Sequence, residues 1–181
     1  MNLHGHTALI TGAGQGIGKA CAEVFAERGA HLILLDKNRK TLPHVAQEIQ
    51  SRGCKVIAHI IDLTHTRPLG QLIETLKKEI NIDILVNNAG FDKPGVTSKI
   101  DKRHLNDVLG IHVGVPFFLI KLLLPDMRSH HWGRIINISS VYGISGAKGE
   151  VAYSTAKAAV IGLTKTIARE AGKEGVTVNA V

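Results

Sequence analysis

The chain has 181 residues, 44% of them hydrophobic and 20% charged, which is enough apolar material for one globular domain and argues against a disordered chain. Its two cysteines, Cys21 and Cys54, form neither a disulfide framework nor a CxxC metal site, so we expect a cytoplasmic protein without a metal. The net charge of +7 is spread along the chain, and no signal-peptide pattern or run of 18 apolar residues occurs, so neither a nucleic acid nor a membrane is an expected partner.

Six short apolar runs alternate with helical patterns along the chain. They cover residues 7–11, 31–36, 55–61, 83–87, 134–139 and 176–181. Because residues of both parities are apolar, each run is typical of a strand that is covered on both faces. The alternation predicts one α/β domain spanning residues 1–181, a parallel sheet between two layers of helices, with a longer helical region at about residues 102–128.

The first run is followed directly by the glycine-rich stretch TGAGQGIG, residues 11–18, and then by a helical pattern. Gly12, Gly16 and Gly18 would let the backbone turn tightly and approach a pyrophosphate at the start of that helix. The spacing departs from GxGxxG, so a purely structural turn is the alternative.

Asp36 ends the second apolar run, where an acidic side chain can accept hydrogen bonds from an adenosine ribose. A carboxylate there would also repel a 2′-phosphate. The sequence therefore predicts a dinucleotide cofactor, with NAD(H) favoured and NADP(H) possible. The alternative for Asp36 is a turn residue at the end of a strand.

The last run, residues 176–181, would be an apolar strand with an uncovered edge, which is an aggregation liability. We expect that the natural protein continues beyond Val181; the alternative is that a partner covers this edge.

Residues 153–157 read YSTAK, and apolar residues recur around them at spacings of three and four, which is typical of a helix with one buried face. Tyr153 and Lys157 then lie one turn apart on this helix. Taken alone, the pair is most simply a lysine that lies along apolar surface beside a half-buried tyrosine.

Four motifs in order give the chain a resemblance to the short-chain dehydrogenase/reductase family: TGAGQGIG, NNAG at 87–90, ISS at 138–140 and YSTAK. The likeness covers essentially the whole chain, and the sequences of the motifs are most similar to those of the 3-oxoacyl-(acyl-carrier-protein) reductases of that family. It implies a three-layer Rossmann fold with strand order 3-2-1-4-5-6. It also implies hydride exchange between a nicotinamide and a secondary alcohol or ketone, such as a 3-oxoacyl compound or a similar small carbonyl substrate.

The resemblance also implies parts that follow residue 181, a substrate lid and a seventh strand. Without them, the 181 residues alone would be weakly active or inactive. A homodimer or homotetramer would form through the helices near residues 102–128 and 152–171.

The site residues are carried over from the same motifs. The implied cofactor-binding residues are Gly12, Gly14, Gln15, Gly16, Ile17, Gly18, Asp36, Asp62, Leu63, Asn88, Ala89, Gly90, Tyr153 and Lys157. The implied catalytic residues are Ser140, Tyr153 and Lys157, with His112 as a further candidate. For Asp62, an N-cap of the following helix is an equal alternative.

In this reading Tyr153 exchanges a proton with the substrate oxygen, and Ser140 holds that oxygen. A free phenol is too weak an acid to supply a base at neutral pH, but an ammonium ~5 Å away stabilises the phenolate by about 3 kcal/mol at an effective dielectric of ~20. Ser139 is the rival of Ser140 and would point to the opposite side of the strand. Tyr142 would line the substrate pocket.

Besides the parts expected after residue 181, one residue departs from the family pattern. His112 stands where many members have an asparagine, so hydrogen bonding there has a different geometry and can titrate. Pro116 removes a backbone donor from the same helix and predicts a kink. The alternatives to an enzyme are a dinucleotide-binding sensor without turnover and a structural fragment that pairs through its last strand.

Overall fold

The computed structural model describes residues 2–181. Its strands are β1 (Thr7–Thr11), β2 (His31–Asp36), β3 (Val56–Ile60), β4 (Ile84–Asn87), β5 (Gly133–Asn137) and β6 (Val176–Ala180). Its helices are α1 (Gly16–Glu27), α2 (Thr41–Gln50), α3 (Thr66–Lys77), α4 (Lys102–Leu109), α5 (Val115–Ser129), α6 (Tyr142–Ser145) and α7 (Val151–Ala171), with a π-helical turn η1 (Gly110–Gly114) and a 3-10 turn η2 (Gly172–Glu174).

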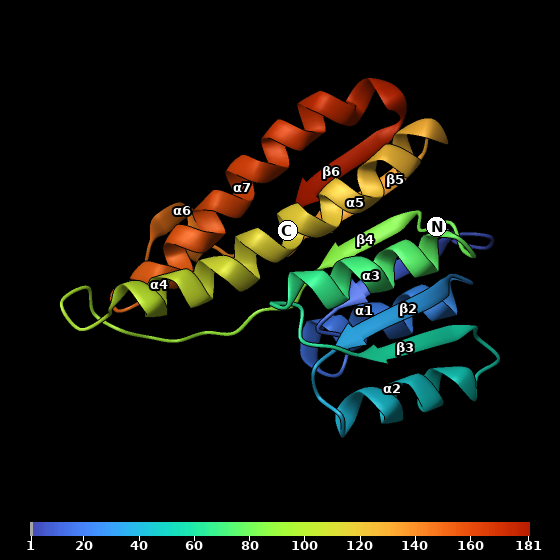
Figure 1. Cartoon of the computed structure of the whole chain (residues 1–181), viewed down its shortest axis with the longest axis horizontal. Coiled ribbons are helices and arrows are strands. Elements are labelled where there is room, and N and C mark those ends of the chain that lie inside the picture. The colour runs from blue at the N-terminus through green and yellow to red at the C-terminus, as the bar shows by residue number, and fades with distance from the viewer. Residues whose placement is uncertain (1) are drawn as a thin grey trace.

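The six strands form one sheet in the order β3-β2-β1-β4-β5-β6 (Figure 1). Every pairing is parallel; Leu9 of β1, for example, pairs with Ile33 of β2 and with Leu85 of β4. This confirms the expected strand order. It also places the carboxyl ends of all six strands at one edge, which is where ligands bind in open sheets of this kind.

Helices cover both faces of the sheet, so the fold has three layers. On one face, α1 and α2 bury alternate strand residues such as Ile10 and Leu34, together with Leu42 and Ile49 of α2. On the other face, residues of α3, α5 and α7 pack against strand residues of the opposite parity, such as Leu9. The four leucine and isoleucine residues 32–35 of β2 are at most 1% exposed, which explains why this run is apolar at both parities.

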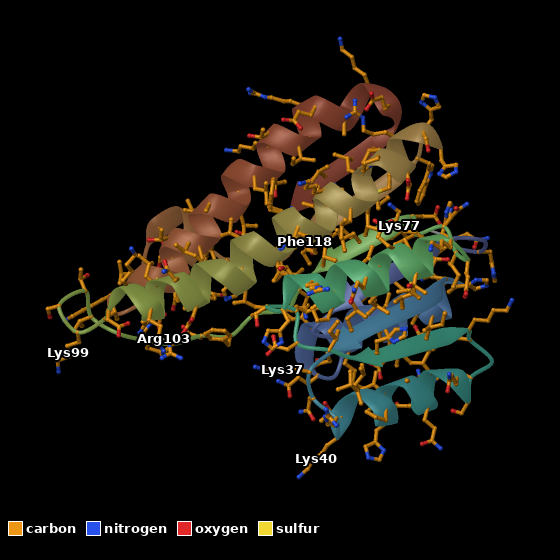
Figure 2. The ribbon with its side chains drawn as sticks, in the orientation of Figure 1. Lys37, Lys40, Lys77, Lys99, Arg103 and Phe118 are labelled. Atoms are coloured by element: carbon orange, nitrogen blue, oxygen red, sulfur yellow. The ribbon has the colours of Figure 1, made fainter. Side chains whose placement is uncertain are left out.

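A continuous helical rod runs through α4, η1 and α5, from Lys102 to Ser129. It is long and apolar enough to cross a membrane by length and composition, although half of its most apolar window is buried inside the protein. Lys77 of α3 joins this rod by donating to Leu122 O at 2.8 Å and by pairing with Asp126 at 3.0 Å, and Gly70 of α3 leaves room for Phe118. Figure 2 shows Lys77 and Phe118 at this contact. The rod is therefore a core element of the three-layer fold.

The expected kink at Pro116 takes a different form. Pro116 lies in the first turn of α5, directly after the π-helical turn of the rod, and it has no N–H to donate to the preceding turn. The departure from α-helical geometry comes just before it, in the π-helical turn Gly110–Gly114. His112 is at the centre of that turn.

A buried polar chain joins β4, β5 and α7. Asn87 Nδ2 donates to Asn137 Oδ1 at 2.8 Å, and Asn137 Nδ2 donates to Thr164 Oγ1 at 2.9 Å. All three side chains are at most 5% exposed. Because buried amides are costly when they lack partners, these bonds fix the position of α7 relative to the ends of β4 and β5.

Candidate active site

The glycine-rich loop connects β1 to α1 at the carboxyl edge of the sheet. Gly12 has a φ of +65°, and a Cβ there would lie 2.9 Å from Ala89 Cα. A Cβ on Gly18 would lie 2.2 Å from Gly12 O. Only glycine fits either place, because the first has left-handed backbone and both meet backbone atoms.

The first turn of α1 is suited to an anion. Its N-cap, Gln15, makes no side-chain hydrogen bond to the helix, and no acidic residue occurs in the first turn. The helix therefore presents free backbone N–H groups and the positive end of its dipole, which is how helix N-termini bind phosphate. Ile17 is 58% exposed here, and Gly16 has open space around it. These residues fit the pyrophosphate of a dinucleotide.

Asp36 lies beside this loop and already accepts two hydrogen bonds. Gly14 N donates to Oδ2 at 2.8 Å and Asn38 N donates to Oδ1 at 2.9 Å. Asp36 is therefore a turn residue at the end of β2, and its carboxylate also joins β2 to the glycine loop. This does not exclude the other interpretation, an acceptor for the adenosine ribose. A carboxylate has about four acceptor sites, so the capacity to accept from ribose hydroxyls remains.

Asp62 and Leu63 follow β3 at the same edge. Asp62 Oδ1 accepts from Thr64 N at 3.0 Å and from Thr64 Oγ1 at 2.7 Å, and these bonds hold the pKa of the Asp62 carboxyl below its usual value. The N-cap of α3 is His65, so the alternative that Asp62 caps this helix is wrong. The Leu63 side chain is 5% exposed and belongs to the core, which leaves its backbone for any contact with a ligand.

The NNAG segment is tied to the glycine loop. Thr11 Oγ1 accepts from Asn88 N and Ala89 N, both at 3.0 Å. Asn88 Nδ2 donates in return to Thr11 O at 2.9 Å and to Gly12 O at 3.2 Å. The segment Asn88–Gly90 therefore lies next to the glycine loop, as expected for two parts of one binding site.

Tyr153 and Lys157 lie one turn apart on α7. Lys157 is 4% exposed, its Nζ donates to Ile138 O at 2.6 Å, and the same atom lies 5.3 Å from the centre of the Tyr153 ring. Burial lowers the pKa of Lys157 to about 8. The simple interpretation of a lysine with its charge in water is therefore wrong, because the ammonium is held inside the protein next to the tyrosine.

The two serines after β5 differ in their contacts. Ser139 Oγ donates to Lys157 O at 3.2 Å, whereas Ser140 Oγ accepts from Tyr142 N at 3.2 Å. The proton of Ser139 is thus used within the fold, and the proton of Ser140 is available to another acceptor. This difference supports Ser140 as the residue that would contact a substrate oxygen.

Four aromatic rings form a row through the site. The His112 ring meets the Tyr153 ring edge to face, with centroids 5.3 Å apart and an interplanar angle of 89°. Tyr142 meets Tyr153 in the same manner at 6.5 Å, and Phe91 lies 6.5 Å from His112. Sequence analysis named His112, Tyr142 and Tyr153 but missed Phe91, and His112 was singled out because it stands where many family members have an asparagine.

The structure thus brings a glycine-rich loop, the NNAG segment and the half-buried Tyr153 beside the buried Lys157 to one edge of a parallel, doubly wound sheet. This arrangement defines the chain as an α/β protein with a dinucleotide-type site. A family model described as short chain dehydrogenase matches residues 6–181. The chain belongs to the short-chain dehydrogenase family, whose members are hydride-transfer oxidoreductases that bind NAD or NADP.

Known relatives support this placement. The chain is 38% identical over 182 residues to a 3-oxoacyl-[acyl-carrier-protein] reductase of Vibrio cholerae, an alignment that covers all of this chain and 73% of the relative. Among solved structures, it superposes on an NAD+-bound xylitol dehydrogenase with a TM-score of 0.93 and 31% identity, covering 99% of this chain and 70% of the other. A 3-oxoacyl (acyl-carrier-protein) reductase from Agrobacterium tumefaciens with NADP bound gives a TM-score of 0.93 and 31% identity, covering 99% and 69%.

Proposed function

We propose that this chain binds NAD(H) at the glycine loop and interconverts a secondary alcohol and its ketone at Tyr153. The observation that carries the proposal is the buried Lys157 ammonium, held by Ile138 O at 2.6 Å and lying 5.3 Å from the Tyr153 ring centre. A charge this deeply buried is costly and is retained where it acts on a neighbour. Here the neighbour is the one phenol that shares its helix.

Lys157, Tyr153 and Ser140 have different roles in the proposed reaction. Lys157 stabilises the phenolate form of Tyr153, so that the phenol oxygen can take a proton from an alcohol or return it to a forming alkoxide. Ser140 donates its free hydroxyl proton to the substrate oxygen and holds it against Tyr153. Bound NAD(H) would accept or supply the hydride at its nicotinamide ring.

The proposed substrate is a 3-oxoacyl compound or a similar small ketone. Two features support this class: the identity to a 3-oxoacyl reductase and the apolar side chains that lie beside the site. Val141 is 67% exposed and Ile144 of α6 is 81% exposed, on either side of Tyr142, whose ring contacts Tyr153. Reduction of acetoacetyl-coenzyme A should therefore exceed oxidation of a polyol, and a faster polyol reaction would contradict the proposed class.

The preference for NAD(H) rests on Asp36. Its carboxylate stands beside the glycine loop and would repel a 2′-phosphate. Lys37 and Lys40 lie just beyond the end of β2 (Figure 2), exposed to solvent, where their charge is screened. The solved relatives hold NAD+ in one case and NADP in two, so they do not support the preference, and it has to be measured on this chain.

The test is a calorimetric titration of the chain with NADH and with NADPH. We expect at least about tenfold tighter binding of NADH, and a ratio within about threefold for Asp36→Asn, since one charge is worth about 1.4 kcal/mol or more at this range. Asparagine is chosen because its oxygen can still accept from Gly14 N, so the loop keeps its shape. Asp107→Asn, on the exposed surface of α4, is the matched control. Tighter binding of NADPH, or an unchanged ratio in Asp36→Asn, would overturn the preference.

A further inference from the structure

His112 contacts Tyr153 directly, yet it has no part in the roles proposed for Ser140, Tyr153 and Lys157. Its side chain is 5% exposed, and its ring meets the Tyr153 ring edge to face with centroids 5.3 Å apart. On its other side, His112 Nε2 lies 2.9 Å from Phe91 O. One imidazole therefore contacts both the catalytic tyrosine and the segment that follows β4.

The hydrogen bond to Phe91 defines the state of the ring. A carbonyl oxygen can only accept, so Nε2 carries a proton and donates it. Burial is the main cause that lowers the pKa of His112, so the ring is neutral at neutral pH. The charged or titratable groups that face it are Tyr153 and Lys157 of α7 and Asp92 of the segment between β4 and α4.

The backbone around His112 is shaped for this ring. His112 is the middle residue of the π-helical turn Gly110–Gly114, and such turns frequently occur at functional sites. A Cβ on Gly90 would lie 2.1 Å from His112 Cε1, so the imidazole packs against the bare Cα of Gly90. A larger residue at position 90 would displace the ring from Tyr153.

We propose that His112 is a positioning residue with two separate contacts: its ring fixes the ring of Tyr153, and its Nε2–H fixes the backbone carbonyl of Phe91. The first contact acts on the proton-transfer step, and the second acts on the segment that would line the cofactor. The inference rests on the proposed function for its kinetic consequence. Its structural consequence, the order of the Tyr153 ring, can be measured without any ligand.

Two substitutions separate the contacts. His112→Gln places an amide N–H near the position of Nε2, so it keeps the donor to Phe91 O and removes the ring. His112→Phe keeps a ring against Tyr153 and removes the donor. An edge-to-face contact and a hydrogen bond are each worth enough for roughly three- to tenfold effects. We expect His112→Gln to lower kcat by that factor with little change in nucleotide Kd, and His112→Phe to raise Kd with little change in kcat.

The order of the Tyr153 ring is measured by NMR on the chain with 13C-labelled tyrosine. The chain has only two tyrosines, so the Tyr142→Phe variant assigns both signals. We expect the order parameter of the Tyr153 ring to fall in His112→Gln and to persist in His112→Phe. If His112→Phe does not fold, the Gln variant alone still decides whether the ring contact holds Tyr153.

His104 provides the matched control. It lies on α4 of the same rod, is 9% exposed, and its Nε2 lies 2.6 Å from Lys93 O, another carbonyl of the β4–α4 segment. No ring contact joins His104 to Tyr153 among residues 2–181. His104→Gln should therefore leave the Tyr153 ring order, kcat and Kd unchanged.

The outcomes are distinct. A His112→Gln variant with an unchanged Tyr153 ring order overturns the inference, as does a His104→Gln variant that lowers that order equally. If the wild-type chain binds no dinucleotide, the proposed function fails, while the ring-order comparison still accepts or rejects the role of His112.

Discussion

At the scale of single residues, the buried ammonium of Lys157 lowers the free energy of unfolding. Lys157 is 4% exposed, and its ammonium has one hydrogen-bond acceptor among residues 2–181, Ile138 O; burial lowers its pKa from 10.5 to about 8. A shift of that size corresponds to about 3 kcal/mol of unfavourable free energy for keeping the charge inside. The protein thus retains a destabilising cation at the one place where it can act on Tyr153.

This cost predicts a particular pH dependence of stability. In the folded chain Lys157 loses its proton near pH 8, whereas in the unfolded chain it keeps the proton to about 10.5. Between these values the unfolded state binds more protons, so folding stability rises with pH, and below pH 8 the full cost remains. Relative to Lys157→Met, the wild type should gain about 2 kcal/mol of unfolding free energy between pH 7.5 and 9.5, measured by urea denaturation.

The comparison with a non-titrating variant cancels the other groups that change charge in this range. Lys165→Met, which removes an exposed lysine of the same helix, is the control and should differ from wild type by a constant amount. A constant difference for Lys157→Met as well would mean that the Lys157 ammonium is solvated in the folded chain.

The two serines after β5 give a second prediction at this scale. Ser140→Ala removes the hydroxyl whose proton is free, and we expect turnover to fall about 10²- to 10³-fold, the usual loss for one donor to a developing oxyanion. Ser139→Ala removes only a bond to Lys157 O, so its main effect should be a loss of stability of about 1 kcal/mol. Steady-state kinetics and urea denaturation of both variants distinguish these effects, and equal kinetic losses would reverse the assignment.

At the scale of elements, the packing of α6 against α7 determines where Tyr142 meets Tyr153. Gly143 makes the contact possible, because a Cβ there would lie 2.7 Å from Lys157 C and 2.9 Å from Ala158 N. Both are backbone atoms of α7 and cannot move aside without bending that helix. The short helix can approach the catalytic pair only because position 143 carries no side chain.

Two glycine substitutions should therefore have opposite effects. Gly143→Ala should lower the free energy of unfolding by about 1–3 kcal/mol, because α6 must move away from α7. Gly162→Ala lies within α7 with nothing near its added Cβ, and should raise that free energy by about 0.5–1 kcal/mol through helix propensity. Denaturation of both variants checks this, and stabilisation by Gly143→Ala would show that α6 is not held against α7 in solution.

The sequence predicted the strands better than it predicted the contacts between distant residues. Strands β1 and β2 have the predicted bounds, and the other four differ from the predicted runs by one or two residues. The agreement is this close because a run of apolar residues at both parities can be recognised within a few consecutive residues. The contact of His112 with Tyr153 joins residues 41 positions apart, since 153 − 112 = 41, and no local period encodes it. The π-helical turn escaped prediction for a related reason: its central residue, His112, packs against Gly90, and this contact between distant parts of the chain has no local signal.

At the scale of the whole molecule, α5 and α7 run side by side (Figure 1) and share an outer groove of about 480 Å³. Apolar residues line much of it, namely Phe117, Ile120, Leu124, Pro125 and Ile167, and Phe117 is 52% exposed. The groove carries Lys121 and Arg128 together with Glu170, so its charges can pair across a two-fold axis. An apolar surface with a mixed polar rim is typical of a subunit interface.

The groove leads to the last prediction, that two copies of the chain associate through α5 and α7. In a two-fold interface each Phe117 would be buried by the partner copy, so Phe117→Glu places two carboxylates in an apolar contact and should convert a dimer to a monomer. Light scattering after size exclusion measures the mass directly. Val24→Glu, the same kind of change at a 48% exposed residue of α1 on the opposite face, should leave the mass unchanged. A monomeric wild-type chain, or an equal effect of both variants, would exclude this face as the interface, and the exposed Phe117 would then need a different explanation.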